Sequence, residues 1–165
     1  MEVRMANEQD MEAISKMVTA IWRAYYPAII THEQIDFMLD KMCSVQALHS
    51  QLSEGHIFMV AEEDNEIAGY IAFYPLNEKE VFLDKLYVKI DMHGRNIGGI
   101  LLNEMMEQTG EEQQIKLQVN RKNIKAINFY FKNGFRIERA ADFDIGNGFF
   151  MNDFVMIKNQ HHGGK

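Results

Sequence analysis

The sequence predicts a fold of helices and strands (α/β in the broad sense, with the α+β arrangement) built around one mixed sheet. Strand-like runs are joined by short polar turns at residues 64–65 and 146–148, which is typical of antiparallel hairpins. Strands and helices alternate one for one only in the middle of the chain, which argues against a fully parallel sheet. The length of 165 residues suits one domain, expected over residues 1–158 with a short tail at 159–165.

Each element has its own local signal. Asn7 can cap a first helix from about Glu8 to Ala24, and Thr31 with Gln34 forms a capping-box pattern that opens a second. A short helix is expected after Ser44, and further helices after the glycine-rich stretch at 92–102 and over 123–134. The expected strands are 1–6, 56–63, 66–75, 80–90, 115–119, 135–145 and 149–157.

Composition and charge limit the classes of function. With 17 Lys and Arg against 24 Asp and Glu, the formal net charge is −7, which argues against a nucleic-acid partner. The N-terminus lacks a secretory signal pattern, and no apolar run reaches the roughly 18 residues of a membrane-spanning helix. Cys43 is the only cysteine, which excludes an intrachain disulfide and fits a reducing, cytoplasmic location. No metal site is expected, since the adjacent His161 and His162 lie in the tail.

The stretch MHGRNIGGILL, residues 92–102, is the most informative local pattern. It joins an expected strand to an expected helix and contains no acidic residue from His93 to Leu102. Glycines let a backbone approach an anion closely, and a helix N-terminus presents N–H groups and a positive dipole end. A pyrophosphate cradle is the natural interpretation, against the alternative of a tight turn that binds nothing. Neither the mononucleotide P-loop nor the dinucleotide fingerprint fits the glycine spacing.

The spacing resembles the acyl-CoA loop Q/R-x-x-G-x-G/A of the GNAT acetyltransferase superfamily, with His93 first, Asn96 fourth and Gly98 sixth. His93 and Asn96 depart from that pattern, but Asn is the non-glycine residue that best tolerates the left-handed conformation. FLDKLYV resembles the family's fourth strand, and residues 117–135 resemble its second motif. The C-terminal region resembles members related to diamine and polyamine acetyltransferases.

The resemblance implies the GNAT fold, with a mostly antiparallel twisted sheet of about seven strands and helices on both faces. It also implies acetyl-CoA as cosubstrate, no metal, and direct transfer of the acetyl group to a primary amine of a polyamine-like small molecule or a peptide. Amino acids and aminoglycosides stay open as acceptors. The implied acetyl-CoA contacts are Leu86, Tyr87, Val88, His93, Gly94, Arg95, Asn96, Ile97, Gly98, Gly99, Asn123, Ala126 and Tyr130.

The helix at 123–134 has two expected faces. Asn123, Ala126 and Tyr130 share the face on which a ligand chain can lie, while a second face is expected to pack on the sheet. The residues of that second face are Ile124, Ile127 and Phe131. Gly134 is expected to end the helix in the left-handed conformation, with Phe135 folding back on it. Tyr130 is the expected general acid, which would protonate the leaving thiolate.

The general base is not determined by the sequence. An alkylamine has a pKa of about 10.4 and must lose a proton before attack. Asp84 is the named candidate, and the alternatives are Glu80, His32, Glu33 or an ordered water chain. Cys43 has no visible histidine partner to activate it as a nucleophile, which favours direct transfer.

The acceptor pocket is expected near the aromatic segment after the first helix, where a cation can lie against aromatic rings. The residues expected there are Trp22, Tyr25, Tyr26 and His32. Core packing is the alternative for the aromatic residues. Two other functions also stay open: a non-catalytic acyl-CoA sensor on the same fold, and a scaffold protein. A homodimer is neither required nor excluded.

Overall fold

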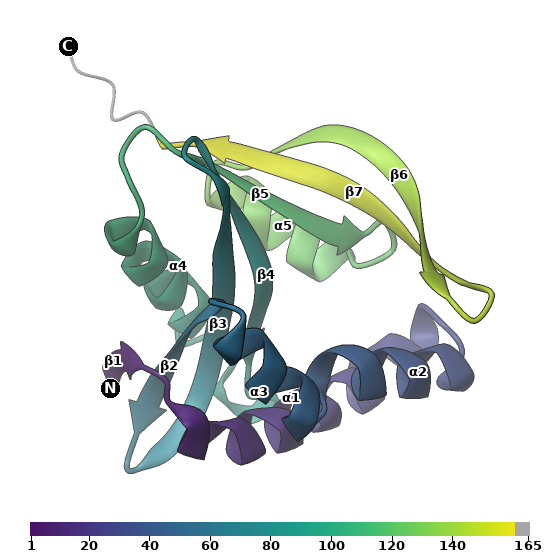
Figure 1. Ribbon diagram of the computed structural model, residues 1–165, viewed down its shortest axis with the longest axis horizontal. Helices are drawn as coiled ribbons and strands as arrows, with labels where there is room; N and C mark the ends of the chain where they lie inside the picture. The colour runs from purple at the N-terminus through teal and green to yellow at the C-terminus, as the bar shows by residue number, and fades with distance from the viewer. Residues whose placement is uncertain (161–165) are drawn as a thin grey trace. The chain divides into compact units, whose positions relative to one another are not determined.

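The computed structural model describes residues 1–160 and contains a seven-stranded sheet with the order β1-β2-β3-β4-β5-β7-β6 (Figure 1). Strands β4 and β5 pair in parallel, whereas the pairs β1–β2, β2–β3, β5–β7 and β6–β7 are antiparallel. The sheet is therefore mixed, as expected. The strands are β1 Glu2–Met5, β2 Ile57–Glu63, β3 Glu66–Asn77, β4 Glu80–Val88, β5 Gln114–Asn120, β6 Arg136–Gly146 and β7 Phe149–Asn159. The α-helices are α1 Met11–Tyr25, α2 His32–Cys43, α3 Val45–Ser53, α4 Ile97–Gln108 and α5 Ile124–Lys132.

The chain divides into two compact units. The first contains Met1–Tyr74 and Lys85–Met105, and the second contains Pro75–Asp84 and Met106 onward. The expected tail falls largely outside the described residues, because β7 continues to Asn159 and the description ends at Gln160. His161 and His162 therefore lie beyond it.

In the first unit, helices cover both faces of the sheet. Gly69 of β3 faces α4 so closely that an added Cβ would lie 3.3 Å from the side chains of Ile97 and Leu101. The next residue, Tyr70, points to the other face, where Tyr87 lies between its ring and that of Trp22 from α1. The turn between β2 and β3 has Asp64 and Asn65 at positive φ, as expected for a tight hairpin.

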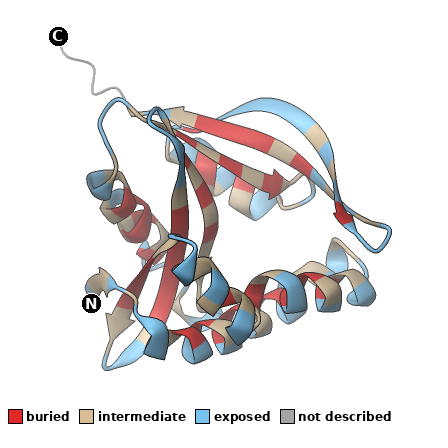
Figure 2. Ribbon diagram, viewed as in Figure 1, coloured by how far each residue is buried: buried red, intermediate tan, exposed pale blue. Residues whose placement is uncertain are grey.

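In the second unit, α5 packs on one face of β5 and β7. Lys158 of β7 donates a hydrogen bond from Nζ to the carbonyl oxygen of Asn133 at the end of α5, at 2.8 Å. Buried residues colour much of β5 and β7 red in Figure 2. The α5 face of this sheet contains Ile115, Leu117, Val119, Phe154 and Met156, by alternation and register.

None of the helices within residues 1–160 combines the length and the apolar character needed to span a bilayer.

Candidate active site

The pairing of β4 with β5 is short. It covers Glu80↔Gln114, Val81↔Ile115 and Phe82↔Lys116, although β4 continues to Val88 and β5 to Asn120. The register between the two strands therefore stops before either strand ends. Main-chain groups of a strand beyond its ladder can accept an extended ligand by strand-like hydrogen bonds. The resemblance to the GNAT superfamily implies such contacts for the backbone of Leu86, Tyr87 and Val88.

The glycine-rich loop has the backbone geometry that an anion cradle needs. Gly94 and Asn96 have φ values of +83° and +58°, which confirms that Asn96 occupies the left-handed conformation. The N–H of Ile100 donates to the carbonyl of Asn96 at 3.0 Å, so the helical bonding of α4 begins there. The N–H groups of the first turn, which include Gly98 and Gly99, are not needed by the helix itself.

Contacts of His93 and Arg95 hold the loop in place. Nε2 of His93 donates to the carbonyl oxygen of Val88 at 2.9 Å, and the His93 ring stacks on that of Tyr25, with centroids 6.1 Å apart. The guanidinium of Arg95 donates two hydrogen bonds of 2.6 Å to the carboxylate of Glu63 at the end of β2. The Arg95 hydrogen bonds lower the pKa of the Glu63 carboxyl. The loop itself contains no acidic residue, but the fold places the carboxylate of Glu63 beside it.

The aromatic residues expected at the acceptor pocket occupy different environments. Trp22 is 4% exposed, with its ring centroid 4.7 Å from that of Tyr26 and 6.2 Å from that of Tyr87. Burial raises the pKa of the Tyr87 hydroxyl well above its ordinary value. Tyr25 and His32 lie at the surface. Trp22 is therefore part of the core of the first unit, whereas Tyr25 and His32 can be reached from solvent.

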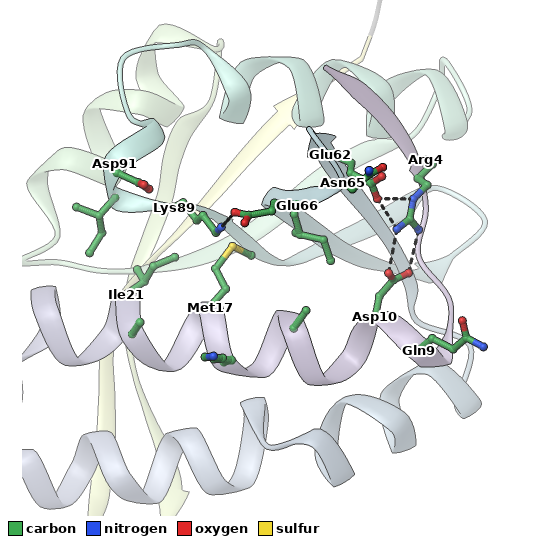
Figure 3. Close-up of a pocket in the computed structure, with 15 residues that line it drawn as sticks. Arg4, Gln9, Asp10, Met17, Ile21, Glu62, Asn65, Glu66, Lys89 and Asp91 are labelled. Carbon is green, nitrogen blue, oxygen red and sulfur yellow. Dashed lines mark hydrogen bonds and ion pairs between the residues drawn. The ribbon is translucent and has the colours of Figure 1, made fainter.

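A pocket of about 730 Å³ lies beside α1 in the first unit, and none of the site residues expected from the sequence lines it (Figure 3). Arg4 is held there between Asp10 at 2.9 Å and Glu62 at 2.7 Å, and Lys89 bonds Glu66 at 3.0 Å. The Arg4 hydrogen bond is the main cause that lowers the pKa of Asp10. These ion pairs connect β1, β2 and β3 to their neighbours and stabilise the wall of the pocket.

Helix α5 is held at both ends. Oδ1 of Asn123 accepts a hydrogen bond from the N–H of Ala126 at 3.3 Å, so this oxygen caps the helix. At the other end Gly134 has φ +85°, and the N–H of Phe135 donates to the carbonyl of Tyr130 at 3.0 Å. This is the expected left-handed ending, with Phe135 folded back on the helix.

The buried face of α5 differs from the expected one. Ile124 and Phe131 were expected to pack on the sheet beside Ile127, but they are 60% and 47% exposed. The buried residues are Ile127 and Tyr130, because the face that meets the sheet is centred between the two expected faces. The Tyr130 ring packs edge-on against Phe135, with a centroid distance of 5.3 Å. Tyr130 is thus a well-packed residue, 9% exposed.

The carboxylates differ in their surroundings. Glu80 accepts hydrogen bonds from Asn77 at 2.7 Å and Lys116 at 3.0 Å, and these lower its pKa, the Asn77 bond most. Asp84 is half-buried on β4. Asp153, which the sequence patterns did not single out, is 2% exposed in the middle of β7. The sequence does contain a sign of this burial. Asp153 alternates with Val155 and Ile157 on one face of the strand, and a buried face normally carries apolar side chains.

Cys43 is buried at 1% exposure, consistent with an unreactive thiol. Within residues 1–160, no three His, Cys, Asp or Glu side chains gather closely enough to hold a metal ion.

Residues 15–135 match the Acetyltransferase (GNAT) family. The chain therefore belongs to the GNAT acetyltransferase family, and it is an N-acetyltransferase whose acetyl donor is acetyl-CoA. The glycine-rich loop, with its left-handed residues and helix N-terminus, fits the pyrophosphate of that donor.

Its relatives cover the chain nearly end to end. A spermidine N(1)-acetyltransferase from Thermoplasma acidophilum is 29% identical over 152 residues, which are 87% of this chain and 93% of that protein. The structure of the PaiA N-acetyltransferase from the same organism, in complex with coenzyme A, has a TM-score of 0.82 at 25% identity, covering 96% of this chain and 98% of that one. A GCN5-related N-acetyltransferase from Rhodopseudomonas palustris has a TM-score of 0.79 at 18% identity, covers 96% of this chain and 94% of its own, and supports the fold alone.

Proposed function

We propose that this enzyme transfers the acetyl group directly from acetyl-CoA to a primary amine of a small polycation of the polyamine type. We infer the class of acceptor from the end-to-end similarity to a protein named spermidine N(1)-acetyltransferase. The net charge of −7 supports it, because a negative protein field attracts a polycation. A peptide amine is the alternative acceptor.

The donor site is proposed from the loop geometry. Main-chain N–H groups of the loop from Gly94 to Gly99 bind the pyrophosphate at the start of α4, where the left-handed Gly94 and Asn96 turn the backbone. The end of β4, Leu86 to Val88, binds the pantetheine arm by main-chain hydrogen bonds. Asn123 and Ala126 contribute the contact from the start of α5.

The chemistry is proposed to use Tyr130 as general acid. Acetyl-CoA supplies the acetyl group as a thioester, and the leaving thiolate needs a proton. A phenol, with a pKa near 10, can deliver that proton to a thiolate whose conjugate acid has a pKa of about 8.5, and take one back from the nitrogen. The packing of Phe135 against the Tyr130 ring restricts the directions in which the hydroxyl can point. A main-chain N–H of β4 polarises the thioester carbonyl.

The acceptor is proposed to bind near Trp22, Tyr25, Tyr26 and His32. Tyr25 and His32 are exposed, and Tyr25 stacks on His93 of the donor loop. A cationic amine against the face of the exposed Tyr25 ring would gain up to about 1 kcal/mol.

The proposal is tested by measuring thiol release from acetyl-CoA with polyamines, peptides, amino acids and aminoglycosides as acceptors. Polyamines are expected to give the highest kcat/KM. The control is Gly98→Val, whose branched side chain at the start of α4 should abolish acetyl-CoA binding while the protein stays folded. Acetyl-CoA binding without turnover on any amine would instead identify an acyl-CoA sensor, and preference for a peptide would reassign the acceptor.

A further inference from the structure

Asp153 lies in the centre of β7, on the face of the sheet opposite α5. It pairs with Asn120 of β5 and Ala141 of β6. Alternation places its side chain on the same side as Ile157 and on the opposite side from Lys158, which contacts the end of α5. Asp153 and the helix that holds Tyr130 are therefore on opposite faces of the same strands.

This carboxylate is buried without a full set of partners. Asp153 and Lys85 are the buried charged side chains of residues 1–160. Lys85 donates from Nζ to Oε1 of Gln51 at 2.6 Å, whereas Oδ2 of Asp153 has no hydrogen-bond partner within the described residues. Burying a carboxylate oxygen without a donor is costly, and buried polar groups in folded proteins normally find one. The site therefore lacks a donor that a ligand can supply.

The neighbouring charges do not supply that donor. Arg121 directs Nη2 to Oδ1 of Asp142 at 2.8 Å and Nη1 to the main-chain oxygens of Asp153 and Ala141, both at 3.4 Å. Arg121 and Asp142 are the charged groups that act on the pKa of Asp153, and Lys116 and Asp84 share its face of the sheet by register. Burial raises the pKa of Asp153 to about 6, with Arg121 acting against it and Asp142 adding to it. At neutral pH the carboxylate is mostly ionised, yet it holds a proton far better than an exposed aspartate.

The face on which Asp153 lies is apolar and buried at Val155 and Ile157 of β7 and more polar along β5. Its β5 residues are Lys116, Gln118 and Asn120, which are all of intermediate exposure. Asp84 is on this face too, because it follows Phe82 by two residues and Phe82 pairs with Lys116. A polar acceptor that reaches Asp153 would therefore lie along the β5 side of this face, beside Asn120.

We propose that Asp153 is the general base of the reaction and binds the acceptor's ammonium group through Oδ2. This inference rests on the proposed function. The carboxylate takes one proton from R–NH3⁺, leaving R–NH2. The C–N bond then forms as the C–S bond breaks, and the second proton of the nitrogen ends on the CoA thiolate, which leaves as the thiol. Asp153 afterwards releases its proton to solvent, so the net products are the acetamide, CoA thiol and one proton.

The test is the pH dependence of kcat/KM with an amine that gives steady turnover. In the natural enzyme kcat/KM should rise with pH and reach a plateau above about pH 6, the pKa of Asp153. In Asp153→Asn it should fall about 100-fold at pH 7 and keep rising toward the pKa of the free amine, about 10.4, because only the neutral amine can react. Asp142→Asn is the matched control and should keep the plateau, whereas Asp84→Asn tests the alternative base.

The outcomes separate the two proposals. No turnover by the natural enzyme on any amine overturns the proposed function, and the role of Asp153 with it. Turnover with an unchanged pH profile in Asp153→Asn overturns the role of Asp153 alone. Loss of the plateau in Asp84→Asn instead would assign the base to Asp84. A melting temperature for Asp153→Asn below that of the natural protein would contradict the unpartnered state of Oδ2 on which the inference depends.

Discussion

Arg95 of the glycine-rich loop forms a two-pronged ion pair with Glu63, a residue 32 positions away in the sequence. The pair joins the donor loop to the hairpin between β2 and β3. It also engages the guanidinium that would otherwise be available to a phosphate group. Since the Arg95 and Glu63 side chains are 46% and 23% exposed, solvent screens the pair and it contributes little to stability.

Glu63→Gln is therefore expected to tighten acetyl-CoA binding by about 2- to 5-fold, because Arg95 becomes free to contact a phosphate. Titration calorimetry at low and at high salt checks this, and the gain should shrink as salt increases. Glu66→Gln, which removes the partner of Lys89, is the matched control and should leave the affinity unchanged. Weaker binding by Glu63→Gln would mean that the pair orders the loop for the donor.

Gly99→Ala is expected to weaken acetyl-CoA binding several-fold. A Cβ at position 99 would collide with Oδ1 of Asn96 and lie 3.1 Å from its Cγ, so the Asn96 side chain must move away from the first turn of α4. Asn96→Gly alone should be tolerated, because glycine accepts the φ of +58°. The double variant removes the collision and should recover most of the affinity. Equal losses in the single and double variants would contradict this account of the loop.

Tyr130→Phe is expected to lower kcat by roughly 100-fold with little change in acetyl-CoA affinity or stability. The substitution removes one oxygen and keeps the ring that packs against Phe135. Steady-state kinetics with the preferred amine, together with a thermal melt, provide the measurement. Near-normal kcat with chemistry rate-limiting would return Tyr130 to a purely structural role.

Asp153 should make the stability of the protein depend on pH. Its pKa is about 6 in the folded state against 3.8 for the ordinary group, so the folded state binds more protons between these values. Stability therefore falls as pH rises from about 4 to 6 and stays reduced above that range. Asp153→Asn should raise the free energy of unfolding by about 1 to 3 kcal/mol at pH 8 and much less at pH 4.

Urea denaturation at the two pH values measures this difference, with Asp142→Asn as the control for a neighbouring acid. A variant that is more stable yet less active would fit a group kept for catalysis at the expense of stability. Equal stability of Asp153→Asn and the natural protein at pH 8 would show that Oδ2 is satisfied in solution.

The local backbone was determined by the sequence. Asp64 and Asn65 in the hairpin, Asn96 in the loop and Gly134 after α5 all have positive φ, as their residue types predicted. The order of strands and helices followed from periodicity in the same way. These features depend on conformational preferences of single residues and near neighbours, and such preferences are written into the chain directly.

Only the tertiary structure decided which side chains meet. Contacts between segments far apart in the sequence include the ion pair of Arg95 with Glu63 and the stacking of Tyr25 on His93. The burial of Asp153 likewise depends on the neighbouring strands of the sheet. The rotation of α5 that exposes Ile124 and Phe131 is of the same kind. A helical pattern restricts the buried face to within one or two residues, but the surface that the helix meets selects the exact face. The charge environment of each acid is likewise a property of the assembled fold, since burial and distant partners shift its pKa.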